Sequence, residues 1–458
     1  MSAVSAWEDD PRSSAAARPV ARPVPLLTHP RLGVVIAGQQ PPARCYVTSS
    51  PAFRYWNAAD ALARTTRFWA GIIPSSTRWT CGTDLTALID AGRDLNAYYD
   101  RKQLCFFHAP VDGTTVYSGE SPDVVCHELG HAVLDALAPA LWNAASIEAA
   151  AMHEAFGDIS AMLSALQLPS VRRAVVKETD GQFTRSSRLS RLAEQLGWAI
   201  RQSHPDAVEA DCLRNAANSF FYAEPESLPP MAPAVVLSSE PHSFSRVLSA
   251  AWLDVLAGMA AVNGADADSL AVVSRDAGAL IARAVQGARV TPNYFAQVSA
   301  EALRADAFLF KGRYRAVLQR AFVGRGVLSS ASAASVPVRE RRQGRANAAA
   351  VRPSTERRRL SIDGATYGLR LTHVVVDAPL STSGRGATAA AADLGPLAPT
   401  TAERASRAFV EDLLRRDRID AGGLELAASG ASRPSRATHA LERHGREVVL
   451  VRTRFHLA

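Results

Sequence analysis

The sequence predicts an α+β protein with a strand-rich N-terminal lobe, a helical lobe after it and a small β-containing C-terminal extension. Short apolar runs broken by turn residues characterise residues 26–117, as expected for strands. Ala- and Leu-rich segments with helical spacing follow as far as residue 328. The predicted units are residues 1–25, a flexible N-terminal segment; 26–137, the strand-rich lobe and the helix that ends it; 138–328, the helical lobe; 329–360, an Arg-rich linker; and 361–458, the extension.

The composition is that of a globular enzyme. Its 458 residues are 47% hydrophobic and 21% charged, which excludes the disordered and fibrous classes of protein. The N-terminus has no apolar core of signal-peptide length, and no run approaches the ~18 apolar residues that cross a bilayer. Five cysteines without a CxxC pair argue against a disulfide framework. We therefore expect a cytoplasmic protein that contacts no membrane, with non-classical export as the alternative.

The net charge of +7 comes almost wholly from arginine. Much of the excess lies between Arg339 and Arg359, where Gly, Ala, Ser and Pro separate the arginines without hydrophobic periodicity. A solvated linker is favoured over a segment that binds nucleic acid or another anion. Nucleic acid is therefore not a predicted partner.

Strands and helices can be placed along the two ends of the chain from the same periodicities. The predicted elements are strands at residues 32–37, 104–107, 360–377 and 447–455, helices at residues 58–70 and 400–415, and a flexible run at residues 387–392. No catalytic motif occurs in the extension, so its role is unassigned.

The helical lobe has legible helix starts. Ser121 and Pro122 supply an N-cap hydroxyl and a proline at the first helical position, so a helix should span residues 122–137. Ser146 opens a second helix that should reach about residue 167, and Pro241 opens a third. Three helices of this kind can meet around one cleft.

The segment His127-Glu128-Leu129-Gly130-His131 is an HExxH motif inside the first of these helices. Residues four apart share one helical face, so both imidazoles can bind one ion with Glu128 beside them. Zinc suits imidazole nitrogens, a carboxylate oxygen and one water. The motif alone also occurs on ordinary surface helices. The second helix adds Glu154 and Asp158, of which one can complete the metal site and the other can support a ligating histidine from behind.

At these residues the sequence resembles the thermolysin family of zinc metallopeptidases. Residues 121–137 look like that family's active-site helix, and residues 153–158 look like its second motif. The resemblance implies the family's two-lobed fold. The metzincin alternative would need glycine and histidine where this chain has Leu134 and Leu137. The roles that the resemblance implies are zinc ligands for His127, His131 and Glu154, general base for Glu128, and support of a ligand for Asp158.

Three further segments resemble the family in order and character, so that the resemblance covers roughly residues 26–328. It implies that Asn96 and Ala97 pair with an extended substrate, that Arg214 bonds a substrate carbonyl, and that His242 steadies the oxyanion. Each also has a plain structural interpretation: Asn96 as a turn cap, Arg214 as the partner of Asp211, and His242 as a helix cap.

The sequence departs from the family in three respects. The family's active-site tyrosine falls at Trp142, whose indole N–H donates but cannot ionise, so we expect Trp142 at the oxyanion or in the cleft wall. Asp123 matches a calcium ligand, but the acids expected after the second motif are missing, and the family's double Ca²⁺ site is not predicted. The long N-terminal propeptide of secreted relatives is also missing, which leaves the control of activity unassigned.

The sequence thus predicts a zinc-dependent metalloendopeptidase that hydrolyses bonds of a peptide or protein, with Glu128 activating the water. Two alternatives stay open. One is a catalytically weak or inactive zinc-binding protein of the same fold that holds a peptide or partner, which Trp142 motivates. The other is a basic scaffold whose Arg-rich linker and extension bind an anion. Side-chain specificity and oligomeric state do not follow from the sequence.

Overall fold

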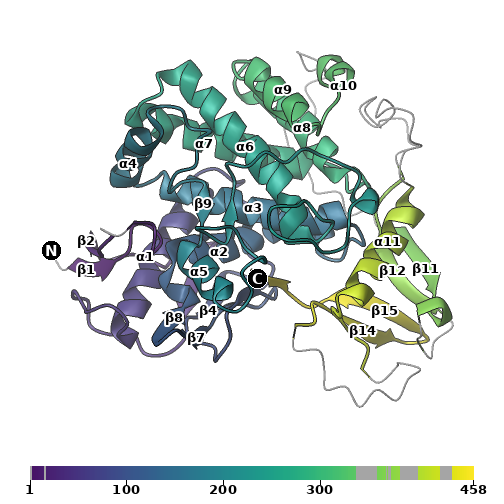
Figure 1. Ribbon diagram of the computed structural model, residues 1–458, viewed down its shortest axis with the longest axis horizontal. Helices are drawn as coiled ribbons and strands as arrows, with labels where there is room; N and C mark the ends of the chain where they lie inside the picture. Colours follow the sequence, from purple (N-terminus) through teal and green to yellow (C-terminus); the bar gives the residue numbers. More distant parts are fainter. Residues whose placement is uncertain are drawn as a thin grey trace.

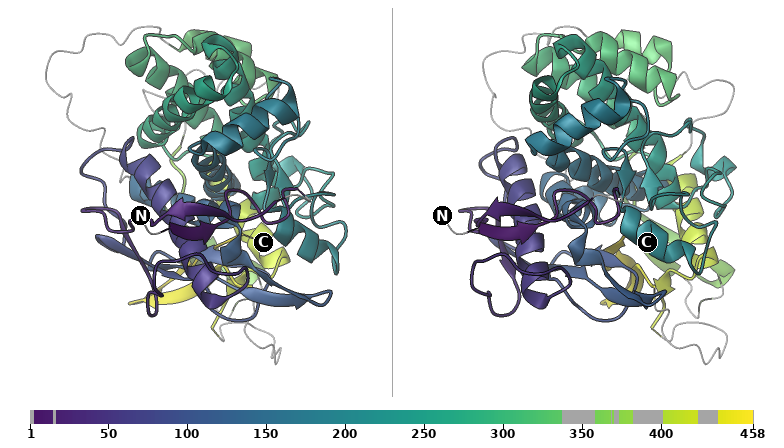
Figure 2. Two further views of the ribbon diagram at one scale, coloured as in Figure 1. Left: turned by 90° about the vertical axis from the view of Figure 1, so that its left-hand side faces the viewer. Right: turned by 60° about the vertical axis from the view of Figure 1, so that its left-hand side comes forward.

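The structure is a computed structural model that describes residues 3–14, 17–336, 358–367, 369, 373–381, 401–422 and 436–457. Helices and strands both contribute substantially, and the predicted α+β class is confirmed (Figure 1). In both views of Figure 2 the green and teal helices lie to one side of the molecule, with the N-terminal strands and the yellow C-terminal sheet on the other.

The N-terminal segment is folded, which corrects the prediction of a flexible one. β1 (Ala3–Ala6) and β2 (Val20–Pro23) form an antiparallel hairpin. Val4 and Ala6 are fully buried, and the N–H of Trp7 donates to Asn57 Oδ1 (2.8 Å) on α1 (Pro51–Ala70). A four-residue strand shows too little alternation to be recognised in the sequence.

One five-stranded mixed sheet forms the strand-rich region, in the order β16-β5-β6-β4-β3. Neighbouring strands β3, β4 and β6 are parallel, whereas β5 runs antiparallel to β6. The predicted strands at residues 32–37 and 104–107 correspond to β3 and β6. The bounds are β3 (Gly33–Ile36), β4 (Asp84–Leu88), β5 (Ala97–Tyr99), β6 (Gln103–Phe106) and β16 (Phe455–His456), with a separate hairpin of β7 (His108–Val111) and β8 (Thr114–Tyr117).

Three capped helices form the centre of the helical region. α2 (Pro122–Leu137) has the predicted bounds, and its N-cap Ser121 side chain accepts from the N–H of Val124. α3 (Ile147–Ala165) packs against both α2 and α6 (Pro241–Asn263). The remaining elements here are α4 (Pro169–Thr179), α5 (Glu194–Arg201), α7 (Ala267–Gly287), α8 (Tyr294–Leu309), α9 (Arg315–Gly324), α10 (Ser330–Ser335), and the short strands β9 (Arg191–Leu192) and β10 (Arg214–Asn215).

Among the described residues, α6 is the one helix long and apolar enough to cross a membrane by length and composition. Its apolar window is 72% buried inside the fold, where it packs against α3, α7 and α9. The core helix of a globular protein has the same character, so this helix is weak evidence for a membrane span.

The extension forms a C-terminal unit, which we define as a second five-stranded sheet with α11 (Ala402–Arg415) packed on it. The predicted strand at 360–377 is in fact two antiparallel strands. The sheet runs β11 (Arg358–Asp363), β12 (His373–Ala378), β15 (Glu447–Arg452), β14 (His439–His444) and β13 (Ile419–Asp420).

The predicted Arg-rich linker is only partly described. Its first residues lie in α10 and its last in β11, whereas residues 337–357 lie outside the described residues, as does the predicted flexible run at 387–392. After β15 the chain leaves the C-terminal unit. Figure 1 shows β16 as the yellow strand that runs from this unit toward the centre of the molecule, where the C-terminus lies.

Candidate metal centre and cleft

The HExxH side chains lie together and buried on α2. His127, Glu128 and His131 have at most 2% of their surface exposed. One ligand atom from each lies within 4.8 Å of the others, so the three form a group that could hold a metal ion. Helical spacing places the two imidazoles on one face, with ring centroids 4.7 Å apart.

Glu154 on α3 faces both imidazoles. Its Oε2 lies 3.4 Å from His127 Nε2, and its Oε1 lies 3.8 Å from His131 Nε2. α3 therefore brings a carboxylate to the open side of the histidine pair, as the sequence predicts. Two imidazoles and one carboxylate are a donor set that zinc accepts.

Several atoms that face this space have no hydrogen-bond partner in the described chain. They are His127 Nε2, His131 Nε2, Glu154 Oε2 and both carboxylate oxygens of Glu128. Buried polar atoms without a partner are costly, and a bound cation with its water would satisfy them. The residues therefore fit a metal ion. Burial raises the pKa of Glu128 to about 8, against the opposing influence of His127, so this carboxyl group is a stronger base than an exposed one.

Asp158 supports His127 from behind. Its Oδ1 lies 3.0 Å from His127 Nδ1, and it also accepts from Arg214 Nη2 (2.8 Å) and from Ser249 Oγ (3.1 Å). Burial raises the pKa of Asp158, but Arg214 and His127 outweigh that effect and hold the pKa well below its ordinary value. A carboxylate at Nδ1 favours the tautomer that leaves Nε2 free for a metal. The plain structural alternative for Arg214, a pair with Asp211, is wrong, because its carboxylate partner is Asp158.

Two glycines let α2 and α3 approach closely enough to join these side chains. A Cβ at Gly157 would lie 2.5–2.7 Å from the Cε1, Nδ1 and Nε2 atoms of His127. A Cβ at Gly130 would lie 2.7 Å from Ser160 Cβ and 3.0 Å from Gly157 Cα. The HExxH and downstream motifs therefore need small residues where their helices cross.

Gly157→Ala is expected to weaken metal binding at least about tenfold, because the new methyl group must push the His127 ring away from Glu154. Helix propensity alone would favour alanine by ~1 kcal/mol. The matched control is Gly324→Ala at the end of α9, where a Cβ meets nothing within 4 Å. Zinc affinity is measured by competition with a chelating dye; equal affinity in Gly157→Ala and wild type would contradict this role.

The residues predicted to bind substrate each contact β16 or Leu457. The space that this segment fills between β5, Arg214 and His242 is called the cleft below. Arg214 Nη1 donates to the carbonyl of Leu457 (3.0 Å), and His242 Nε2 donates to the carbonyl of His456 (2.7 Å). Asn96 Nδ2 lies 2.6 Å from His456 Nδ1. The sequence shows no sign of these contacts, since their partners follow every recognisable motif.

His242 also joins the metal group. Its Nε2 lies 3.3 Å from Glu154 Oε2, and its Nδ1 lies 2.7 Å from Glu240 Oε1. Burial lowers the pKa of His242, but the carboxylates of Glu154 and Glu240 outweigh it, so that the pKa is raised. A ring with acceptors at both nitrogens is suited to donate a hydrogen bond to a carbonyl oxygen.

Trp142 packs against β16, and its N–H is bonded to the C-terminal unit. The indole Nε1 donates to the carbonyl of Arg452 (3.0 Å), and the ring packs edge-on against Phe455, with centroids 5.3 Å apart. The predicted oxyanion role is not supported by this orientation, because the donor is already bonded elsewhere. The cleft-wall alternative stays a prediction.

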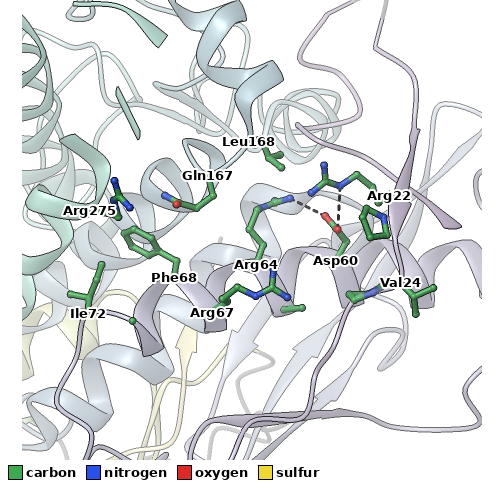
Figure 3. Close-up of a pocket in the computed structure, with 14 residues that line it drawn as sticks. Arg22, Val24, Asp60, Arg64, Arg67, Phe68, Ile72, Gln167, Leu168 and Arg275 are labelled. Carbon is green, nitrogen blue, oxygen red and sulfur yellow. Dashed lines mark hydrogen bonds and ion pairs between the residues drawn. The ribbon is translucent and has the colours of Figure 1, made fainter. Parts of the chain in front are cut away.

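Two cavities flank this region. One of about 410 Å³ adjoins the cleft, and its walls include Leu213, Arg214, His242 and Leu457. Another of about 430 Å³ lies beside α1 and contains no predicted site residue. Figure 3 shows arginines from several elements converging on this second cavity, with Asp60 bonded to two of them.

Asp123 belongs to a different buried group. One oxygen atom each from Asp10, Asp123 and Glu194 lie within 4.8 Å of one another, a group that could hold a metal ion. Asp10 comes from the N-terminal segment, so no local motif marks this cluster. Burial, with the neighbouring carboxylates adding to it, raises the pKa of Glu194 to about 11.

Glu194→Gln is expected to raise the melting temperature at pH 8 more than at pH 4.5, measured in EDTA so that no cation neutralises the cluster. Because the pKa of Glu194 is raised from 4.5 in the folded chain, the folded state binds more protons, and wild-type stability falls as pH rises above about 4.5. Glu178, whose pKa Arg188 lowers against burial, provides the control: Glu178→Gln should lower stability at pH 8. A drop for Glu194→Gln would contradict the account.

A search with known family models finds no match to this sequence, and a search of curated proteins finds none. The assignment of a function therefore rests on the site's own geometry.

Proposed function

We propose that this chain is a zinc metalloendopeptidase with the two-lobed, thermolysin-like architecture. The observation that carries the proposal is the buried group of His127, His131, Glu154 and Glu128, whose facing atoms have no hydrogen-bond partner among the described residues. Beside it lie a sheet edge, an arginine and a histidine that already bind an extended segment of chain. A metal group next to a peptide-binding edge suits metal-assisted peptide hydrolysis.

Each side chain has a distinct role. Zinc, held by His127, His131 and Glu154, would supply Lewis acidity and lower the pKa of a bound water. Glu128 would take a proton from the attacking water and pass it to the leaving amine, since its carboxylate has no hydrogen-bond partner among the described residues. Asp158 holds the His127 ring in the required tautomer.

The cleft would hold substrate through its backbone. β5 would offer an extended peptide the edge that β16 occupies, and Arg214 and His242 would donate to two successive carbonyls, as they do to Leu457 and His456. The 410 Å³ cavity, whose lining includes Ile200, Val208 and Leu213, adjoins the residue that follows the His242-bonded carbonyl. We infer that it receives an apolar side chain on the leaving-amine side.

His242→Ala is expected to keep zinc but to lower turnover by about 10²–10³-fold, the usual cost of losing one oxyanion donor. Because His242 also bonds the carbonyl of His456 in β16, the substitution is made in the chain that carries Phe455→Arg and Leu457→Arg. Zinc content and the cleavage rate of a fluorescent peptide are measured together. His444→Ala, an exposed histidine on β14, is the matched control and should change neither. Undiminished turnover in His242→Ala with zinc retained would remove His242 from the mechanism.

The proposal is tested by metal content and by cleavage of a quenched fluorescent peptide library. Because β16 lies in the cleft, the assay uses both the wild type and the tail variant, which we define as the full chain with Phe455→Arg and Leu457→Arg. We expect about one zinc ion per chain and cleavage that a chelator abolishes and added zinc restores. Zinc in both proteins with cleavage in neither would refute the peptidase.

The second candidate is a zinc-binding protein that holds a peptide without cutting it. It is favoured by Trp142, which stands where the related enzymes have a tyrosine and whose N–H is bonded to Arg452. This candidate predicts that the tail variant binds peptides from the library tightly and releases them intact.

A further inference from the structure

The last strand of the chain lies in the cleft that the proposed function assigns to substrate. β16 pairs antiparallel with β5, with Phe455 opposite Tyr99 and His456 opposite Tyr98. The N–H of Leu457 extends the pairing by donating to the carbonyl of Ala97 (3.0 Å). Strand addition is a common way to bind an extended peptide. β16 therefore takes the place that the sheet edge would give to such a peptide.

The side chains predicted to bind substrate are all occupied by this strand. His242 bonds the carbonyl of His456, Arg214 bonds the carbonyl of Leu457, and Asn96 bonds the His456 ring. The peptide bond between His456 and Leu457 thus lies between the proposed oxyanion donor and the proposed carbonyl anchor. The end of the chain is held in the register of a substrate.

The strand covers the metal group without taking its ligand atoms. The ring of Phe455 stacks on His131 and His153, with centroids 5.1 and 4.0 Å apart. His127 Nε2 and His131 Nε2 still have no partner in the described chain. β16 therefore shuts the cleft to other peptides while the ligands remain available to a metal.

The C-terminal unit fixes this strand from outside the cleft. Arg452 Nε donates to the Trp142 carbonyl (3.0 Å), and the Arg452 N–H donates to Asn143 Oδ1 (3.0 Å). The N–H of Ala145 donates to the carbonyl of Asp377 (2.8 Å) on β12. The segment after α2 is thus bonded to two strands of the unit.

A second set of contacts holds the unit against the helical region. Arg416, at the end of α11, lies 3.4 Å from Glu240, the residue that also bonds His242. The N–H of Leu380 donates to the carbonyl of Val290 (2.7 Å), and Arg404 pairs with Glu226. Because these anchors lie apart from β16, the unit is docked as a body and not by its last strand alone.

We propose that the C-terminal unit is a built-in inhibitor that holds β16 in the cleft in the position of a substrate. The inference rests on the proposed function, since inhibition requires an activity, but the docking of β16 does not. Because β16 is tethered to the chain that it binds, its effective concentration at the cleft is in the millimolar range. A free peptide therefore competes poorly with β16. The enzyme becomes active when the unit undocks or is cut away.

The first test compares cleavage rates of the wild type and the tail variant. The two arginines place positive charge beside Arg452 and the proposed metal group, and beside the arginines that line the cavity around Leu457. Repulsion between like charges should expel β16 and raise the initial rate at least about tenfold at equal zinc content. Arg443→Ala, an exposed arginine on β14, is the control and should leave the rate unchanged. Arg452→Ala cuts an anchor and leaves β16 itself intact, so it should activate even if the tail variant folds poorly.

The second test adds a synthetic peptide of residues 450–458 to the tail variant. It should inhibit competitively, and a scrambled peptide should not. A tail variant and Arg452→Ala that both cleave no faster than wild type, and are not inhibited by the peptide, would overturn the inference and leave the proposed function standing.

Anisotropy of the labelled peptide separates the remaining cases. If no variant cleaves, binding of this peptide to the tail variant and not to wild type supports the docking of β16 in the cleft. The failure to cleave then contradicts the proposed function alone. Absence of binding in that case overturns the inference as well.

Discussion

Glu128→Gln is expected to lower peptide cleavage by the tail variant at least about 10³-fold while zinc content stays unchanged. The amide keeps the size and shape of the side chain but cannot take a proton from water. Both oxygens of Glu128 are buried without a partner in the described chain, so the substitution breaks no existing hydrogen bond. Initial rates and zinc content are measured on the same preparation.

The control for this prediction is Glu148, a second buried glutamate, which lies on α3. Glu148 accepts hydrogen bonds from Tyr222 Oη (2.6 Å) and from the N–H of Phe295 (2.7 Å), away from the metal group. Glu148→Gln should lower the melting temperature but leave cleavage per folded chain intact. If Glu128→Gln leaves the cleavage rate of the tail variant unchanged, Glu128 is not the general base.

Glu154→Gln is expected to lose zinc. Loss of a carboxylate that supports a ligand typically lowers metal affinity about 10–100-fold. Replacing one of the three protein ligands by a weak amide oxygen should lower the zinc affinity by more than that. Asp158→Asn provides that comparison, because Asp158 touches His127 and Arg214 and not the space between the ligands. The predicted order of zinc affinity is wild type, then Asp158→Asn, then Glu154→Gln.

Competition with a chelating dye measures this order, and His444→Ala, an exposed histidine, serves as the control that should match wild type. The loss of affinity should be accompanied by a proportional loss of cleavage at limiting zinc. A Glu154→Gln variant that binds zinc as tightly as wild type would exclude Glu154 as a ligand.

The centre of the molecule could be predicted from sequence because its signals are local. Ser121 and Pro122 fix the start of α2, and the spacing of His127 and His131 fixes their shared face. Glu154 and Asp158 lie one turn apart on the helix that packs against α2, so their placement follows once α3 begins at Ser146.

The rest depends on contacts between segments far apart in the chain. β16 has only two residues, which is too short for a periodic signal, and it pairs with a strand about 360 positions earlier. The predicted strand at 447–455 therefore ran through the break that separates β15 from β16. The N-terminal hairpin and the cluster of Asp10, Asp123 and Glu194 could not be predicted from the sequence for the same reason. The partner of the Trp142 indole also lies about 310 residues away.

Anomalous diffraction at the zinc edge, from crystals of the wild-type chain grown with zinc, would locate the metal. The account predicts a strong peak among His127 Nε2, His131 Nε2 and the Glu154 carboxylate, with bonds of about 2.0–2.2 Å. No peak at that position, or zinc found only at Asp10, Asp123 and Glu194, would contradict the proposed metal centre.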